Sequence, residues 1–369
     1  MGIPEKIKAI QDEMGRTQLN KATEHHIGVL KAKIAKLKRE QEANQIKKSS
    51  KKSDGFDVKR SGDATIVIIG LPSVGKSTLL NALTGSKSSV GAFQFTTVTV
   101  VPGILDYRGA KIQMLDLPGI IKGASSGKGL GKRILSVARS ADIILLVLDV
   151  FQPYHEDVLV NELSNIGIRL NQKPPNILIE KSSTGGIAIA QQVKLKKMSE
   201  KLVKDILNIY GYTSARVVIR EDIDSEQLID FITGSKTYAK SITVLNKIDL
   251  VDEKFLKKAS KKIKTEFIPV SADANDNITE LRDRIYDELQ FIRIYMRPKG
   301  GKTDYKEPLI IRKGNSILDV CNKLHRKLKR DFRYGLVWGK SVKFAGQRVG
   351  RNHVLRDEDV LTIIKIKGT

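Results

Sequence analysis

The chain has 369 residues, of which 40% are hydrophobic, with 29 glycines and 10 prolines, so it can build folded cores and is neither largely disordered nor collagen-like. That length favours about two to four domains over one. It carries 65 Lys and Arg against 41 Asp and Glu, a net charge of +24, which indicates a polyanionic partner. RNA or the ribosome is the first expectation, and an anionic membrane surface is the second. Most of the excess lies in residues 1–60 and 305–369, with net charges of +7 and +10.

The sequence shows no apolar signal core near its first residue and no apolar run of the roughly 20 residues that span a bilayer. We therefore expect a cytoplasmic protein without a membrane partner. The one cysteine, Cys321, has no second cysteine with which to form a disulfide and is expected to be a small core residue.

Residues 3–48 place apolar side chains at helical spacing between lysines, which predicts a basic helical hairpin. Contact with ribosomal RNA and binding to a partner protein explain its lysines equally well. Residues 45–62 are polar and rich in lysine and serine, which is typical of a linker. We therefore expect a first domain over residues 1–60.

Short, nearly continuous apolar runs at residues 65–69, 111–115, 143–150 and 241–245 alternate with helical patterns. Strands of this kind are buried on both faces, as in a parallel α/β sheet. The sequence therefore predicts an α/β domain formed by residues 61–172 and 241–298. Residues 173–240 contain their own strand and helix patterns and are expected to form an inserted α+β subdomain.

Residues 305–369 follow a Pro-Lys-Gly-Gly break and predict strands at 308–312, 334–338 and 360–366 around a helix at 317–329. This is the pattern of a small α+β module. Residues 321–351 hold ten basic side chains interleaved with Phe332, Tyr334 and Trp338. That density favours RNA contact over a merely solvated helix face.

The sequence GLPSVGKS at residues 70–77 follows a predicted strand and precedes a helical run that begins at Thr78. This context is the one that a phosphate-binding P-loop requires, and a plain Gly-rich turn explains it poorly. Backbone N–H groups would surround a β-phosphate, Lys76 would lie between the β- and γ-phosphates, and the Ser77 hydroxyl would bind Mg²⁺. The expected nucleotide contacts are Gly70, Pro72, Ser73, Val74, Gly75, Lys76, Ser77 and Thr78.

Three further motifs end predicted strands in the order that a guanine-nucleotide site needs. Asp116 begins the turn DLPG, where it can hold Mg²⁺ through water and Gly119 can offer its N–H to a γ-phosphate. In NKID, Asp249 can accept two hydrogen bonds from guanine while Asn246 and Lys247 order the loop. Adenine lacks that donor pair, which argues against an ATPase. Ser271 and Ala272 follow the last strand and are placed to contact the guanine carbonyl.

The chain resembles the Obg superfamily of GTPases, and within it the developmentally regulated GTP-binding protein family. The resemblance covers nearly the whole chain and rests on the P-loop, on FTTV at 95–98, on the Gly-rich stretch at 116–131 and on ARSAD at 138–142. The motifs GIRLN at 167–171, PPNI at 174–177 and IRED at 219–222 resemble the insertion of this family. Residues 305–369 resemble a TGS domain, a ubiquitin-like module that threonyl-tRNA synthetases share.

The resemblance implies an α/β fold: a P-loop GTPase parallel sheet with an N-terminal helical hairpin, an inserted α+β subdomain and a C-terminal TGS domain. It assigns Thr97, preferred over Thr96 by motif alignment, to Mg²⁺ and the γ-phosphate. The expected catalytic residues are Lys76, Thr97 and Gly119, and the expected metal ligands are Ser77, Thr97 and Asp116. Ile120 stands where related GTPases place a water-orienting Gln, so slow intrinsic turnover is expected. Ser73 replaces an Asn that helps some relatives bind K⁺, which leaves potassium activation open.

Taken together, these features predict a Mg²⁺-dependent GTPase switch that cycles between GTP and GDP and acts in translation or on the ribosome. The basic helices and the TGS domain would contact RNA, and an adaptor protein is a further candidate partner. The alternative from another class is an RNA-binding ribosome assembly factor or chaperone in which GTP only sets the conformation, a role that Ile120 favours.

Overall fold

The computed structural model describes residues 2–18, 20, 23–48, 62–85, 93–95, 98–117, 130–234 and 236–366. The chain forms two compact units, one of residues 1–55 and 167–238 and the other of residues 56–166 and 239–369. Each is described by itself.

The larger unit is built on a sheet whose strand order is β11-β10-β5-β1-β4-β3-β2. Five adjacent strands, from β11 to β4, are parallel, as the apolar runs predict for β1, β4, β5 and β10. These strands are β1 (Ala64–Gly70), β4 (Ala110–Asp116), β5 (Ile143–Asp149), β10 (Thr237–Asn246) and β11 (Phe267–Pro269). Ile66, Ile68 and Leu145 are fully buried, because helices cover both faces of this part of the sheet.

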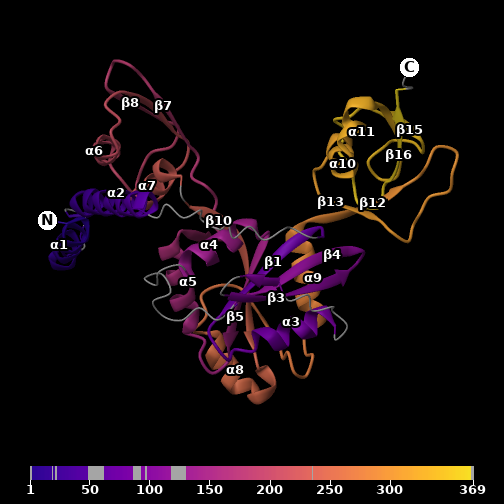
Figure 1. Ribbon diagram of the computed structural model, residues 1–369, viewed down its shortest axis with the longest axis horizontal. Coiled ribbons are helices and arrows are strands. Elements are labelled where there is room, and N and C mark those ends of the chain that lie inside the picture. The colour runs from indigo at the N-terminus through magenta and orange to yellow at the C-terminus, as the bar shows by residue number, and fades with distance from the viewer. Residues whose placement is uncertain are drawn as a thin grey trace. The chain divides into compact units, whose positions relative to one another are not determined.

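Helices α3 (Lys76–Thr84) and α9 (Ile278–Leu289) share one core with the sheet, through side chains such as Leu79 and Leu281. Helices α4 (Leu130–Ser140) and α5 (His155–Ile166) cover the other face (Figure 1). Helix α8 (Glu253–Ser260) lies between β10 and β11 in the chain. These layers are those of a doubly wound α/β domain, which places the carboxyl ends of the parallel strands at one edge.

The sheet also has an antiparallel extension that the apolar runs do not announce. β3 (Val98–Tyr107) pairs antiparallel with β4, and β2 (Phe93–Phe95) pairs antiparallel with β3. The turn between β3 and β4 is only two residues long, Arg108 and Gly109, and both have positive φ. So short a connection allows only an antiparallel pair.

The C-terminal module has a five-stranded sheet of order β13-β12-β16-β14-β15. Its strands are β12 (Phe291–Met296), β13 (Leu309–Arg312), β14 (Phe332–Trp338), β15 (Gln347–Val349) and β16 (Val360–Lys365). β12 precedes the Pro-Gly break at which the sequence suggested that the module begins. Its side chains serve two cores, because Ile292 and Ile294 pack in the module and Phe291 packs with the α/β domain.

The helical part of this module differs from the single helix expected at 317–329. α10 (Ile317–Leu324) and α11 (Arg326–Asp331) are separated by His325, whose extended backbone has φ −168° and ψ 136°. The His325 side chain accepts a hydrogen bond from the Lys327 N–H at 3.1 Å and so caps the second helix. Cys321 on α10 is fully buried, as its isolation in the sequence suggested.

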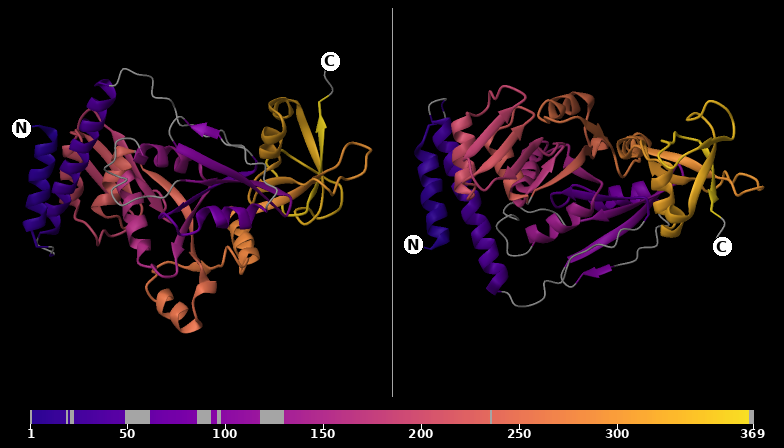
Figure 2. Two further views of the ribbon diagram at one scale, coloured as in Figure 1. Left: turned by 60° about the horizontal axis from the view of Figure 1, so that its bottom comes forward. Right: turned by 90° about the horizontal axis from the view of Figure 1, so that it is seen from above.

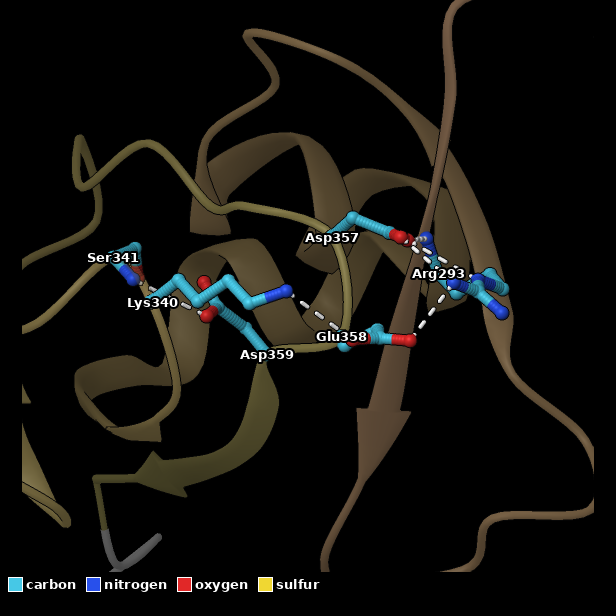
Figure 3. Close-up of polar contacts among 6 residues, drawn as sticks. All are labelled: Arg293, Lys340, Ser341, Asp357, Glu358 and Asp359. Atoms are coloured by element: carbon cyan, nitrogen blue, oxygen red, sulfur yellow. Dashed lines mark hydrogen bonds and ion pairs between the residues drawn. The ribbon is translucent and has the colours of Figure 1, made fainter. Parts of the chain in front are cut away.

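A cluster of ionic contacts fixes the loop before β16 (Figure 3). Arg293 donates to Asp357 at 2.8 Å and to Glu358 at 3.0 Å, and Lys340 also reaches Glu358 at 3.3 Å. Asp359 is fully buried and accepts from the backbone N–H of Ser341. The loop is thereby held against β12 at one end of the module.

This cluster gives the module an expected acid sensitivity. Burial raises the pKa of Asp357, but the hydrogen bonds and charge of Arg293 outweigh it, and the net pKa is lowered. A carboxyl group with a lowered folded-state pKa stabilises the fold above its ordinary pKa of about 4 and loses that contribution as the pH falls below it. We expect Asp357→Asn to reduce the loss of module stability between about pH 6 and about pH 3. Urea unfolding followed by the fluorescence of Trp338, the one tryptophan, measures it; equal acid losses in both proteins would contradict it.

The smaller unit combines the N-terminal hairpin with the inserted subdomain. α1 (Ile3–Arg16) and α2 (Glu24–Lys48) lie side by side (Figure 2). α2 packs on α6 (Glu200–Ile209) and α7 (Ser225–Thr233), and Ala32 of α2 is fully buried in their core. A three-stranded sheet completes the unit in the order β7-β9-β8, with bounds Ile177–Lys181, Ala215–Ile219 and Ile187–Gln191. The short strand β6 (Ile168–Leu170) also belongs to this unit, although it precedes residues 173–240, where the insertion was expected.

Two lysines of α2 serve this unit's own fold. Lys36 donates to the Ile209 carbonyl at 2.8 Å, and Lys31 pairs with Glu226 at 2.6 Å. Contacts with the inserted subdomain therefore explain part of the basic spacing that the sequence left open between RNA and a partner protein.

Candidate nucleotide-binding site

The P-loop lies where strand β1 passes into helix α3. β1 ends at Gly70, and α3 begins at Lys76 with Gly75 as its N-cap residue. Gly75 has no side chain to cap the helix, so the first N–H groups of α3 have no side-chain cap and could bind an anion. Ser73 and Gly75 both have positive φ, at 63° and 87°, which curls the backbone between them.

Asn246 connects this loop to a second one. Its Nδ2 donates to the Val74 carbonyl at 2.9 Å, and its Oδ1 accepts from the Ala272 N–H at 3.1 Å. The side chain is 2% exposed, so both bonds lie away from water. A Cβ atom on Gly75 would lie 2.4 Å from Asn246 Nδ2, which shows how closely the P-loop approaches the end of β10.

Ser77 and Asp116 face each other across the mouth of the P-loop. The Ser77 hydroxyl donates to Asp116 Oδ2 at 2.7 Å, and Asp116 Oδ1 is buried without a hydrogen-bond partner among the described residues. Burial raises the pKa of the Asp116 carboxyl, against the lowering effects of Ser77 and Lys76. A hydroxyl and a carboxylate with a free buried oxygen are a donor set that suits a hydrated Mg²⁺.

Lys76 lies over the P-loop and donates to the Leu71 carbonyl at 2.8 Å. Its side chain is buried, and burial lowers the pKa of the ammonium, while the negative charge of Asp116 opposes that shift. The lysine is therefore a partly desolvated cation, which interacts strongly with a phosphate.

Lys247 forms a clamp that the motif alone does not reveal. Its Nζ donates to the Ser73 carbonyl at 2.8 Å and to Asp149 Oδ2 at 2.7 Å. Asp149 ends β5 directly beside Asn246 in the sheet register. The sequence analysis missed Asp149, although a carboxylate that ends a buried strand was the signal that singled out Asp116.

The remaining predicted residues gather at the same edge. Ser271 is fully buried, and its hydroxyl accepts from the Ala274 N–H at 3.0 Å, which fixes the loop that carries Ala272. Asp249 is exposed on a short 3-10 turn, Ile248–Leu250, directly after the clamp lysine. The structure thus brings together the P-loop, Asp116, the NKID segment and the Ser-Ala loop. Thr97, Gly119 and Ile120 lie outside the described residues.

The family comparisons agree with this geometry. Residues 65–181 match a family described as 50S ribosome-binding GTPase, residues 184–291 match the C-terminal region of the MMR_HSR1 domain, and residues 292–365 match the TGS domain. A GTP-binding protein of Methanocaldococcus jannaschii is 52% identical over 99% of this chain and 93% of its own length. Developmentally-regulated GTP-binding protein 1 of Xenopus laevis is 45% identical, over 98% of each chain. The chain belongs to the developmentally regulated GTP-binding protein family.

Membership of this family confirms the resemblance and the P-loop GTPase fold with its C-terminal TGS domain. It makes the chain a GTPase that binds and hydrolyses GTP. Among solved structures, the YchF GTPase of Schizosaccharomyces pombe is similar, with a TM-score of 0.44 and 16% identity over 83% of this chain and 99% of that one. None of the helices in the described part of the chain has the length and apolarity needed to cross a bilayer.

Proposed function

We propose that this GTPase is a Mg²⁺-dependent switch that acts in translation, on the ribosome or on another translational RNA in the cytoplasm. The observation that carries the proposal is that the P-loop, Asp116, the NKID segment and the Ser-Ala loop meet at one sheet edge in a chain of net charge +24. The description of the matching family, a 50S ribosome-binding GTPase, supports the same partner.

At the nucleotide, each residue has a proposed part. The backbone from Gly70 to Thr78, with Pro72, Ser73 and Val74, would surround the phosphates, and Lys76 would neutralise the charge that develops between them. Asn246, Lys247 and Asp249 would hold the guanine, with Ser271 and Ala272 beside its carbonyl. Thr97 and Gly119 are proposed as the switch contacts to the γ-phosphate.

Mg²⁺ would be held by Ser77 and by Asp116 through water, with Thr97 as the third ligand of the proposed set. The ion would neutralise negative charge on the phosphates when bound. In the structure, the Ser77 hydroxyl oxygen and Asp116 Oδ2 already lie 2.7 Å apart, joined by a hydrogen bond. This preorganisation reduces the cost of assembling the site.

Replacing Ser77 by Ala tests the metal assignment. The variant removes one oxygen ligand and leaves the Asp116 carboxylate buried without its hydroxyl donor. We expect the Mg²⁺ concentration for half-maximal GTP hydrolysis to rise about 10-fold, an effect equal to about 1.4 kcal/mol of metal binding. A Mg²⁺ titration of turnover measures it, with Ser260→Ala on α8 as a matched control. Superimposable titrations of Ser77→Ala and the unchanged protein would contradict the assignment.

The ribosomal role is tested by GTP turnover with and without ribosomes, each in potassium and in sodium buffer. We expect slow turnover alone and stimulation by ribosomes, because Ile120 has no side chain that can orient water. Stimulation by potassium alone would show that the cation acts despite Ser73. Fast turnover of the isolated protein in sodium would contradict the switch.

The same measurement separates the alternative, an RNA-binding assembly factor or chaperone in which GTP only sets the conformation. That protein would bind ribosomal particles in a nucleotide-dependent way without any increase in turnover. An adaptor protein remains part of the proposal as a further partner, and would appear as stimulation that purified ribosomes alone do not supply.

A further inference from the structure

The sheet of the TGS module has an open face, opposite the face that packs on α10. Along β14, Val337 is buried in the module core, and a Cβ on Gly335 would meet Ile317 and Leu361. The alternate residues Tyr334, Leu336 and Trp338 therefore lie on the open face. They are half-buried, as side chains lying on an uncovered sheet would be.

The strand register extends this face across the sheet. Val360 aligns with both Tyr295 and Trp338, and Leu336 aligns with Thr362 and Arg348. Tyr334 aligns with Ile364 in the next row. The positions of the four strands on this face are Tyr295, Tyr334, Leu336, Trp338, Arg348, Val360, Thr362 and Ile364, and Arg297 follows directly after β12. Val360 and Thr362 are buried, so the accessible part of the face is formed by the other side chains.

Arginines lie over the aromatic rings of this face. Arg348 Cζ is 4.1 Å from the centroid of the Tyr334 ring, and Arg297 Cζ is 4.8 Å from that of Trp338. The exposed Arg333 approaches Tyr334 from the same strand, at 6.0 Å. Aromatic rings and guanidinium planes are the two protein surfaces on which unpaired nucleobases stack.

Two further residues contact the aromatic side chains of this face. The turn before β15 places Gly346 against Trp338, where a Cβ would lie 3.2 Å from the indole Nε1, so a larger residue would displace the ring. Tyr305, which is 65% exposed, stands 5.0 Å from Tyr295 and adds an aromatic ring at the β12 side. Tyr334 and Trp338 stand four residues apart on one strand, about 13 Å, so an extended chain crossing β14 could meet both.

Positive charge exceeds negative charge along this face. Arg293 lies at one end, where Asp357 and Glu358 neutralise it (Figure 3). None of the open-face positions beyond it carries a carboxylate. Among the described residues, Arg297 and Arg348 form no ion pair. Arg297 Nε donates to the Gly301 carbonyl at 3.1 Å, and Arg348 is exposed.

Some of the basic residues that the sequence singled out form ion pairs, whereas the exposed Lys327 and Lys343 form none among the described residues. Lys323 pairs with Asp63 of the α/β domain at 2.7 Å, and Lys340 pairs with Glu358. Arg330 contacts Asp331 at 3.1 Å. Arg297 and Arg348 differ from these residues in lying over aromatic rings, which gives an unpaired base a surface on which to stack as well as a charge.

We propose that the open face of the TGS sheet, defined by Tyr295, Arg297, Tyr334, Trp338 and Arg348, binds single-stranded RNA. Unpaired bases stack on Tyr334, Trp338 and the guanidinium planes, and the arginines neutralise phosphates. A duplex offers phosphates but keeps its bases stacked inside, so it gains only the electrostatic part. The proposal deepens the proposed function, on which it rests, by naming the surface and the form of RNA.

Trp338 makes the proposal measurable, because it is the only tryptophan and lies in the site. The full-length protein is titrated with a single-stranded oligoribonucleotide of about 10 nucleotides, and in parallel with a fully paired RNA duplex of the same composition. We expect saturable quenching of Trp338 by the single strand, and at least about 10-fold weaker binding of the duplex with little quenching.

Three variants identify the contacts. Tyr334→Leu keeps the apolar volume but removes the stacking ring and should weaken the single strand about 10-fold. Arg348→Gln removes one exposed positive charge and one stacking plane, and should weaken it by a similar factor. Lys327→Gln on α11 removes the same charge from an exposed site away from the open face and should change binding less than about 2-fold.

The outcomes are decisive for this surface. Equal weakening by Arg348→Gln and Lys327→Gln, or equal affinity for single strand and duplex, would overturn the stacking proposal in favour of diffuse electrostatic binding. An absence of quenching by any RNA would overturn it in favour of a protein partner for this face. Trp338 fluorescence without RNA shows whether Tyr334→Leu unfolds the module. If it does, the comparison of RNA affinity between Arg348→Gln and Lys327→Gln still tests the proposal.

Ribosome-stimulated GTP turnover, measured on the same proteins, distinguishes failure of the open-face proposal from failure of the proposed ribosomal function. Stimulation without any binding of single-stranded RNA would refute the open-face proposal and leave the switch function standing. Loss of both would refute the ribosomal function as well.

Discussion

Replacing Asn246 by Ala is expected to abolish measurable GTP binding and to lower the stability of the α/β domain. The side chain joins the P-loop to the Ala272 loop through two buried hydrogen bonds. Its removal leaves the Val74 carbonyl and the Ala272 N–H without this partner, at about 1–3 kcal/mol for each buried group. It also frees two loops that must hold phosphate and guanine at the same time, so the loss in affinity should exceed about 100-fold.

Nucleotide binding is measured with a fluorescent GTP analogue, and domain stability is measured by hydrogen exchange of the amides of β1 and β10. Asn246→Asp is a second variant: it keeps an acceptor for Ala272 but places a buried carboxylate oxygen against the Val74 carbonyl, so it should also weaken GTP binding. Asn176→Ala, at an exposed site in the smaller unit, is the matched control. Unchanged GTP affinity in Asn246→Ala would show that the two loops are positioned without this link.

The buried strands were predictable because burial on both faces leaves a direct mark on the sequence. β1, β4, β5 and β10 are nearly continuous apolar runs, and polar residues end them at the nucleotide edge. The antiparallel β3 was not predicted, because Pro102, Gly103 and Asp106 interrupt its apolar pattern. Its pairing is set by the two-residue turn at Arg108 and Gly109, a signal weaker than an apolar run.

The candidate site was also predictable from the sequence only in part. Motifs place Lys76, Ser77, Asp116 and Asp249, because their chemistry is tied to fixed spacing from a strand end. The links between the loops come from residues far apart in the chain, as when Lys247 bridges Ser73 and Asp149. Such links depend on strand order, which places β5 between β1 and β10, and no local pattern shows that order.

The C-terminal module shows why charge counts alone mislead about a binding surface. From the sequence alone, every lysine and arginine of the module is an equal candidate for binding a polyanion. In the fold, Lys323 lies next to Asp63, a residue 260 positions earlier in the chain, and pairs with it. Arg297 and Arg348 form no ion pair among the described residues and lie over the rings of Trp338 and Tyr334. Register, which assigns alternate residues to one face, was needed to find them.

Asp249→Asn is expected to reverse the choice of base. The carboxylate at this position can accept hydrogen bonds from the ring N–H and the exocyclic amino group of guanine, whereas xanthine presents a carbonyl in place of the amino group. An asparagine amide offers one acceptor and one donor, which matches xanthine. Hydrogen bonds to a charged group contribute about 1.5–3 kcal/mol each, so GTP affinity should fall at least about 100-fold while XTP affinity rises.

Competition between GTP and XTP for the purified variant measures this reversal. Asp249 is exposed on its 3-10 turn, so its substitution should leave the fold and the Asn246 and Lys247 contacts intact. That separates the two variants: Asn246→Ala should weaken both nucleotides because it disorders the site, and Asp249→Asn should exchange one for the other. Asp273→Asn removes the same charge from an exposed position in the neighbouring loop and should leave the preference for GTP unchanged. If Asp249→Asn instead keeps the full preference for GTP, another group reads the base and the proposed guanine contact is wrong.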